Sequence, residues 1–310
     1  MQYSVVIPCY KSSNTISKVI ELTSNELHEY THEFILVNDA SPDSGATRQA
    51  INALAEAYDN VTAIDLSINS GQHNAILCGL SYACGNFIIC MDDDMQTHPS
   101  QIHLLIDKIN EGYDVVYASY PEKKHSFFRR LGSSFNSLCE WIFINKPKTL
   151  ETNSYWIMRS FVKDYLITYS NSYAYLDGLV MRTTRNIANV PVKHFEREYG
   201  TSGYTFKKLV AHWFDIVGFT IAPLKAAFCL GLFTSLLSII ATIVIIIRKA
   251  SNGMQTIGWS SIMVTVCFFS GVILIFMGVI GEYVGRLFQA SNKEPQYVIR
   301  QIKGKNVKDD

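Results

Sequence analysis

Three consecutive aspartates follow directly on an apolar run in the segment FIICMDDDMQ. Alternate side chains of an extended chain share a face, so Asp92, Asp94 and Gln96 should point one way and Asp93 the other. Two carboxylates and an amide oxygen suit a hard divalent cation such as Mg²⁺ or Mn²⁺, with positions left open for substrate phosphates. The alternative is a solvated acidic turn ahead of the next helix. A further acid, Asp39, follows another strand-like run and favours the metal site.

Short apolar runs alternate with helix-like stretches in the first part of the chain. The strand-like runs cover residues 3–7, 34–37, 61–66, 87–91 and 115–118. The helix-like stretches cover residues 15–27, 46–58, 74–84 and 101–110. This alternation predicts an α/β fold with a mostly parallel, Rossmann-like sheet and helices on both faces. Ligands bind beyond the carboxyl ends of the strands in such sheets, which is where the acidic run lies.

Composition excludes several other classes of protein. The 310 residues include 27 basic and 27 acidic side chains, so no broad basic field is available for a nucleic acid. No Gly-x-Gly-x-x-Gly or Walker sequence occurs, which removes the usual support for a dinucleotide or P-loop site. The seven cysteines form no Cys-x-x-Cys pair, and we expect them to be reduced core residues.

Charged residues are scarce near the C-terminus. No Asp, Glu, Lys or Arg occurs in residues 226–247 or in residues 250–281. Because roughly 20 apolar residues cross a bilayer as a helix, we expect a transmembrane hairpin with spans at 226–247 and 259–281. The alternative is a buried hairpin in a soluble protein. Lys and Arg are more numerous on either side of the hairpin than in its loop, which predicts a multi-pass protein of the plasma (inner) membrane with both termini cytoplasmic.

These boundaries divide the chain into four predicted parts. They are a cytoplasmic α/β domain (1–203), a linker with an amphipathic helix (204–225), the hairpin (226–281) and a cytoplasmic tail (282–310). In the linker, Phe206, Trp213 and Phe214 fall on one apolar stripe, as in helices that lie at a membrane interface. A helix packed against the first domain is the alternative.

Six short motifs follow one another along nearly the whole chain. They are VVIPCY (5–10), VNDAS (37–41), NSGQ (69–72), MDDDMQ (91–96), RxxGxS (197–202) and GEYVGR (281–286). In this order the chain resembles the family 2 glycosyltransferases of GT-A fold, and most closely the group that transfers sugars to polyprenyl phosphates. The resemblance implies that residues 1–203 are a GT-A catalytic domain. It also implies transfer of a sugar from a nucleotide sugar to a lipid phosphate.

The resemblance further implies roles for the matched residues. Those expected to bind substrate are Pro8, Tyr10, Asp39, Asn69, Gln72, Asp92, Arg129, Arg130 and Ser202. Those expected to bind Mg²⁺ or Mn²⁺, which would bridge the donor diphosphate, are Asp92, Asp94 and Gln96. The expected catalytic residues are Asp94, Arg197 and Asp93.

Some of these assignments have alternatives. Arg129 and Arg130 are equally typical of surface charges on a membrane-facing helix. Asp39 could close an Asx turn with Ser41 and Pro42 instead of contacting the donor.

Several positions depart from the family pattern. Lys11 and Ser12 stand where many relatives have Asn and Glu, and Asp93 stands where a small residue is usual. Ser154 and Trp156 stand where some relatives have an Asp, regarded as a candidate base, and an Arg. The Lys that follows the loop Ser in the family is Gly203 in this chain.

A phosphate acceptor reduces the need for a base. A phosphate monoester has a second pKa near 6, so at neutral pH it attacks as an ionised oxygen. The enzyme's main tasks are then to orient the reactants and to neutralise the departing nucleotide diphosphate. We expect in-line displacement at the anomeric carbon, with inversion. Two alternatives stay open. Transfer to a glycan or lipid hydroxyl would need Asp93 or Glu151 as base. A non-catalytic membrane partner of a lipid-sugar flippase would need neither.

The resemblance favours a UDP-sugar such as UDP-glucose as donor and undecaprenyl phosphate as acceptor, in the assembly or modification of cell-surface glycans such as O-antigen. Expected partners are the bilayer, further copies of the chain (a tetramer, for example), a flippase and a downstream glycosyltransferase, but no nucleic acid. The sequence does not identify the sugar, the nucleotide, the length of the lipid or the pathway.

Overall fold

β1 (Tyr3–Cys9) lies inside the sheet, and all seven of its residues are buried. Its side chains alternate between two hydrophobic clusters, with Val5 and Ile7 in one and Val6 in the other. A strand that is apolar on both faces is what a sheet covered by helices on both sides requires. The computed structural model describes residues 1–120, 141, 146–147, 149–171, 174–193, 195, 258–292 and 294–304, with isolated positions between 224 and 247.

Within the described residues, eight strands form one sheet in the order β7-β5-β6-β4-β1-β2-β3-β8. Besides β1 they are β2 (His32–Asn38), β3 (Val61–Leu66), β4 (Phe87–Cys90), β5 (Val115–Ser119), β6 (Trp156–Arg159), β7 (Ile187–Pro191) and β8 (Ile299–Lys303). β1, β2, β3 and β4 are parallel to one another, and β5 is parallel to β7. β6 runs antiparallel between β4 and β5, and β8 runs antiparallel to β3. The α/β prediction is confirmed, but the sheet is mixed, because β6 and β8 run antiparallel to their neighbours. No strand was predicted for either of these segments.

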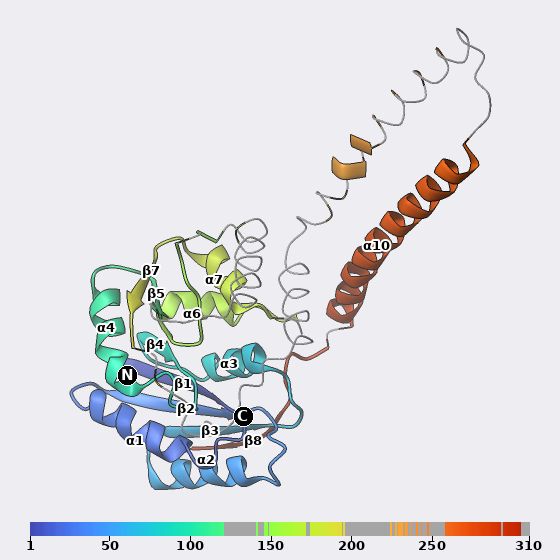
Figure 1. The fold of residues 1–310 in the computed structure, drawn as a ribbon. Helices are drawn as coiled ribbons and strands as arrows, with labels where there is room; N and C mark the ends of the chain where they lie inside the picture. Colours follow the sequence, from blue (N-terminus) through green and yellow to red (C-terminus); the bar gives the residue numbers. More distant parts are fainter. Residues whose placement is uncertain are drawn as a thin grey trace.

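Helices cover both faces of the sheet, as predicted. α1 (Ile16–Glu26), α2 (Ala46–Ala57) and α4 (Ile102–Asn110) contribute to one core cluster. α3 (Gln72–Leu80), α6 (Ser160–Leu166) and α7 (Leu176–Thr183) contribute to the other. A short 3₁₀ turn, η1 (Pro99–Gln101), precedes α4. Figure 1 shows α1 and α2 beneath the sheet and α3 and α6 on its other side.

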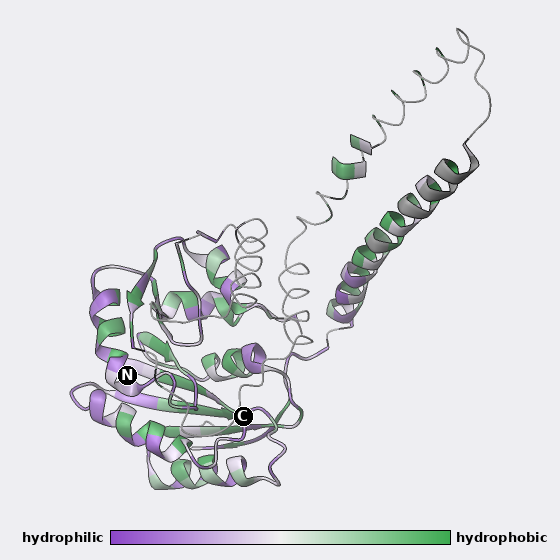
Figure 2. Ribbon diagram, viewed as in Figure 1, coloured by the Kyte–Doolittle hydropathy of each residue, from purple (hydrophilic) through white to green (hydrophobic). Residues whose placement is uncertain are grey.

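α10 (Trp259–Ser291) is a single helix of 33 residues that extends away from the sheet (Figure 1). Its stretch Phe269–Ser291 has a mean hydropathy of 1.7 and is not buried, so by length and composition it could cross a membrane. Figure 2 shows the hydrophobic colour recurring along this helix as it does in the strands. After α10 the chain returns to the sheet as β8.

These observations test only part of the predicted hairpin. The second span, 259–281, lies within α10, but the helix continues to Ser291. The C-terminal part from residue 282 is therefore not a simple tail, since it completes a helix and adds a strand. The first span and the linker at 204–225 lie outside the described residues, apart from isolated helical positions.

The close packing of α3 on the sheet generates a stability prediction. A Cβ atom on Gly79 would lie 2.5 Å from Cγ1 of Val6 and 3.1 Å from Cγ2 of Val37. We expect Gly79→Ala to destabilise the fold by about 1–3 kcal/mol, as overpacking of a core does. The measurement is the Tm of the purified protein in detergent, with Gln49→Ala on the exposed side of α2 as control. A Gly79→Ala variant as stable as this control would contradict the packing.

Candidate active site

The carboxyl ends of β1 to β4 meet at one edge of the sheet, which we call the rim. The loops after three of these strands contain non-glycine residues in the left-handed region, with φ of 61° at Lys11, 46° at Ala40 and 64° at Met95. Such conformations cost on the order of 1–3 kcal/mol each and persist only where surrounding contacts hold them. The backbone at the rim is therefore strained, and we expect hydrogen bonds at the rim to hold these conformations in place.

Asp92 is held from two sides at the rim. Its Oδ1 accepts a hydrogen bond of 2.8 Å from Nε2 of Gln72, and its Oδ2 accepts one from the hydroxyl of Ser154. Burial raises the pKa of Asp92 to about 7; the neighbouring Asp94 and Asp93 add to the rise, and the hydrogen bonds oppose it. A cation beside this carboxylate would favour its ionised form.

The rest of the acidic loop is organised by a short turn. Oδ1 of Asp94 accepts a 3.0 Å hydrogen bond from the backbone N–H of Gln96, which closes the turn over Met95. Asp92 and Asp94 could hold a divalent cation, because their oxygens are hard donors close in the chain. The described residues contain no group of three His, Cys, Asp or Glu side chains arranged for a metal. The remaining ligands would have to be the Gln96 amide, substrate phosphate or water.

Asp93 bonds to the β1 loop, whereas Asp92 bonds to Gln72 and Ser154. Residues 93–97 form bends and not the extended chain for which alternating side chains were predicted. Oδ2 of Asp93 accepts a 2.9 Å hydrogen bond from the backbone N–H of Tyr10 and another from the hydroxyl of Ser12. Burial raises its pKa, while these hydrogen bonds lower it. Ser12 and Asp93, two departures from the family pattern, thus contact each other. These contacts are those of a residue that positions the loop.

Asp39 joins the β2 loop to the β3 loop. Its two oxygens accept hydrogen bonds from the backbone N–H groups of Ser70 (2.6 Å) and Gly71 (3.0 Å), and its carbonyl accepts one from Asn69 (3.0 Å). Burial raises its pKa despite these donors. The Asp39 side chain does not bond to Ser41 as considered from the sequence; Oδ1 of Asn38 instead accepts hydrogen bonds from the backbone N–H and the hydroxyl of Ser41.

The remaining predicted site residues lie in different environments. Pro8 lies within β1 and is buried, not beyond the strand as the sequence suggested. The side chain of Tyr10 is 48% exposed, with Nζ of Lys11 5.8 Å from its ring centroid. Oε2 of Glu151 accepts a 3.4 Å hydrogen bond from the backbone of Tyr120. Residues outside the described part of the chain are Arg129, Arg130, Arg197 and Ser202.

Ser154 belongs to the site, although the sequence suggested only that a carboxylate was missing there. It precedes β6, whose antiparallel insertion beside β4 brings it to Asp92. Nothing in the local sequence pairs these residues, because the contact depends on strand order.

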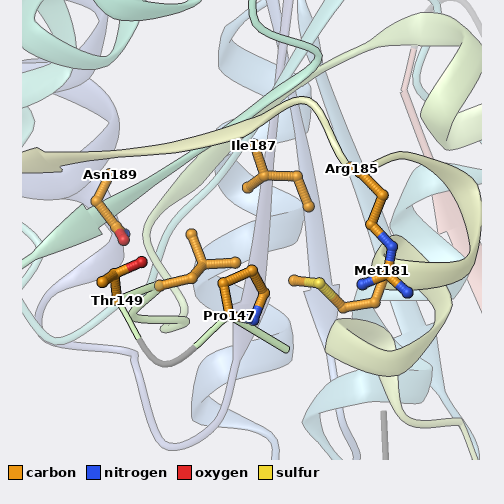
Figure 3. A pocket seen from close by; sticks show the side chains of 7 residues that line it. Pro147, Thr149, Met181, Arg185, Ile187 and Asn189 are labelled. Carbon is orange, nitrogen blue, oxygen red and sulfur yellow. The ribbon is translucent and has the colours of Figure 1, made fainter. Parts of the chain in front are cut away.

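A pocket of about 290 Å³ lies at the β7 edge of the sheet, and no residue of the acidic loop lines it (Figure 3). It is lined by Pro147, Thr149, Leu150, Met181, Arg185, Ile187 and Asn189. None of these is a predicted site residue. Oδ1 of Asn189 accepts a 2.9 Å hydrogen bond from the backbone N–H of Glu151, and Nδ2 of Asn189 donates one of 2.7 Å to the carbonyl of Glu151.

A family model described as "Glycosyl transferase family 2" matches residues 4–168, which include the whole rim described above. The chain belongs to glycosyl transferase family 2. The resemblance noted in the sequence is thereby confirmed.

Relatives of this family 2 glycosyltransferase align over nearly its whole length. The undecaprenyl-phosphate 4-deoxy-4-formamido-L-arabinose transferase of Enterobacter sp. (strain 638) is 30% identical over 96% of this chain and 93% of its own. CsbB of Bacillus subtilis (strain 168), named as a glycosyltransferase, is 32% identical over 96% of this chain and 91% of its own. These relatives support the polyprenyl-phosphate group.

A solved structure supports the fold. Glucosyl-3-phosphoglycerate synthase from Mycobacterium tuberculosis, in complex with Mn²⁺, uridine diphosphate and phosphoglyceric acid, matches with a TM-score of 0.54 at 17% identity. The match covers 70% of this glycosyltransferase and 76% of that chain. It confirms a GT-A-like arrangement of sheet and helices.

The contacts of Asp93 predict that two substitutions will behave differently. In Asp93→Asn the side-chain carbonyl can still accept from Tyr10 and Ser12, so kcat should stay within about threefold of the parent. Asp93→Ala removes both hydrogen bonds and should raise KM for the donor about tenfold. Steady-state turnover of the nucleotide sugar measures both. If Asp93 were a general base, Asn would instead lower kcat by about 10²–10⁴-fold.

The raised pKa of Asp92 predicts a pH-dependent response to metal. Between 3.8 and about 7 the metal-free folded protein keeps a proton on Asp92 that the unfolded chain has released, so this group makes the fold less stable as the pH rises. A divalent cation would offset that cost. Mg²⁺ or Mn²⁺ should raise the Tm more at about pH 8 than at about pH 5.5.

Two variants control this measurement. Asp92→Asn should remove the difference between the two pH values, because the titrating group is gone. Glu111→Gln, in a surface ion pair with Lys108, should retain it. Equal stabilisation by metal at both pH values in the parent protein would contradict the link between the titration of Asp92 and metal binding.

Proposed function

We propose that this glycosyltransferase transfers a sugar from a nucleotide sugar to a polyprenyl phosphate, with undecaprenyl phosphate as the acceptor. The observation that carries the proposal is the acidic loop after β4, held by Gln72 and Ser154 at the rim. It has support from the Enterobacter relative, whose name describes transfer to undecaprenyl phosphate and which aligns over 96% of this chain. That alignment extends beyond the family domain into the C-terminal part.

Mg²⁺ or Mn²⁺ is the proposed cofactor, and Asp92, Asp94 and Gln96 are its proposed ligands. When bound, such a cation neutralises the charge that develops on the leaving nucleoside diphosphate. Gln72 and Ser154 fix the orientation of the Asp92 carboxylate beforehand. Preorganisation of this kind lowers the cost of assembling the site around substrate.

The donor's nucleoside is proposed to bind beside the β1 loop. Tyr10 has an exposed ring that a base could stack on, and Asp93 holds its backbone in place. Asp39 fixes the loop at Asn69–Gly71, so its proposed contribution to donor binding includes the shape of that loop. We propose a UDP-sugar, such as UDP-glucose, as the donor.

The acceptor phosphate supplies its own nucleophile. As a dianion near neutral pH it needs no proton removed, which agrees with a serine at position 154, where a base would otherwise be sought. The phosphate oxygen forms a bond to the anomeric carbon as the bond to the nucleoside diphosphate breaks. Arg129, Arg130, Arg197 and Ser202 are proposed to contact the phosphates. An α-linked donor would give a β-linked product.

α10 is proposed to anchor the enzyme in the plasma membrane, as the second span of a hairpin with both termini in the cytoplasm. Leu274, Met277 and Leu287 are each more than 60% exposed, so apolar surface is available for lipid. A membrane anchor suits an acceptor that is confined to the bilayer. The proposed partners remain a flippase, a downstream glycosyltransferase and further copies of the chain.

The test offers the purified protein a panel of nucleotide sugars with undecaprenyl phosphate or undecaprenol, and Mg²⁺ or Mn²⁺. We expect product lipid, detected by mass, only with the phosphate. Asp94→Ala should lower turnover by at least about 100-fold, the effect of losing several kcal/mol of charge stabilisation. Glu111→Gln is the matched control. Product from undecaprenol, or an α-linked product from an α-linked donor, would refute the proposed reaction.

A further inference from the structure

β8 follows α10 in the chain and extends the sheet at β3. Its register pairs Gln301 with Asp65 and Ile299 with Leu66, so Arg300 is an extra residue opposite this step. Such a bulge redirects a side chain that regular pairing would place on the other face. A further backbone hydrogen bond of 2.8 Å, from the N–H of Ser67 to the carbonyl of Val298, continues the pairing beyond the bulge.

The redirected Arg300 side chain reaches a buried carboxylate. Its Nη1 lies 3.4 Å from Oδ2 of Asp65, and its Nη2 donates to the carbonyl of Ser67 at 3.1 Å. The Asp65 side chain is only 3% exposed, and Nη1 of Arg48 lies 3.6 Å from the same oxygen. A buried carboxylate requires such partners, because an unpaired one would pay a large desolvation cost.

Asn38 connects the Asp65 carboxylate to the rim. Oδ1 of Asp65 accepts a 2.6 Å hydrogen bond from Nδ2 of Asn38, which leaves Oδ1 of Asn38 to accept from Ser41. The hydroxyl and backbone N–H of Ser41 both donate to that oxygen, at 2.6 and 3.2 Å. The Ser41 hydroxyl oxygen in turn accepts a 3.0 Å hydrogen bond from the backbone N–H of Lys11.

The last member of this chain is at the proposed donor site. Lys11 has a φ of 61°, and it follows Tyr10, whose exposed ring we assign to the nucleoside. Each link from β8 to Lys11 is a direct hydrogen bond or ion pair. The strand that follows α10 is thus connected to the strained backbone of the β1 loop.

We propose that Arg300 is a positioning residue for donor binding. Through Asp65, Asn38 and Ser41 it holds the β1 loop in the conformation that receives the nucleotide. This inference rests on the proposed function only in placing the donor at the rim. It makes the C-terminal segment part of the donor site's support, not merely the end of an anchor.

The experiment uses the full chain in detergent and two readouts. The first is the Kd of whichever of UDP, GDP and dTDP binds the parent protein most tightly in the presence of Mg²⁺. The second is the separation of donor KM from kcat. We expect Arg300→Ala to raise both Kd and KM about tenfold, with kcat changed less than about threefold. Arg300→Lys should fall between, because an ammonium group cannot reproduce the forked contact to Asp65 and Ser67.

Lys303→Ala is the matched control on the same strand. Lys303 pairs with Glu56 at 2.6 Å, outside the chain of contacts to Lys11, and its loss should leave Kd and KM unchanged. Ser41→Ala tests the other end of the relay without altering β8, and remains informative if Arg300→Ala fails to fold. It should raise Kd and KM in the same direction.

Two results would overturn the proposal. One is an Arg300→Ala variant with a lower Tm but unchanged Kd and KM, which would make the residue a structural brace alone. The other is an equal rise in Kd and KM for Lys303→Ala, which would assign the effect to strand docking in general. Nucleotide binding reports on Arg300 even if polyprenyl phosphate is not the acceptor, so the two proposals fail separately.

Discussion

Carboxylates that are buried or partly buried at the carboxyl ends of the strands hold the rim of this glycosyltransferase together. A carboxylate removed from water must accept hydrogen bonds or meet a cation, and here the donors come from a different loop in each case. Asp93 binds the β1 loop, Asp39 binds the β3 loop, and Asp92 binds Gln72 and Ser154. Since each acid joins two loops, the loops are fixed relative to one another before substrate arrives.

This arrangement also explains how backbone strain is tolerated. Lys11, Ala40 and Met95 adopt left-handed backbone conformations, which residues other than glycine rarely adopt. Ala40 follows Asp39 and Met95 follows Asp94 in the chain, and Lys11 lies between Tyr10 and Ser12, which both donate to Asp93. The favourable hydrogen bonds offset this local cost.

The C-terminal segment links two parts of the molecule that differ in chemistry. α10 is apolar and exposed, whereas β8 belongs to the sheet and carries Arg300 to Asp65. In the proposed function, a helix of this kind confines the enzyme to the membrane that holds its proposed lipid acceptor. Because β8 pairs with β3, the same segment contributes to the edge of the catalytic sheet.

Local pattern in the sequence determined the strands and helices of the first half, both helix-covered faces and the place of the acidic loop after β4. These follow from hydrophobic periodicity and from chain geometry over a few residues. Only the tertiary structure decided that β6 and β8 enter the sheet antiparallel, that Ser154 meets Asp92, that Asn38 and not Asp39 bonds to Ser41, and that Arg300 reaches Asp65. Those contacts join residues far apart in sequence, and they depend on strand order, which periodicity does not encode.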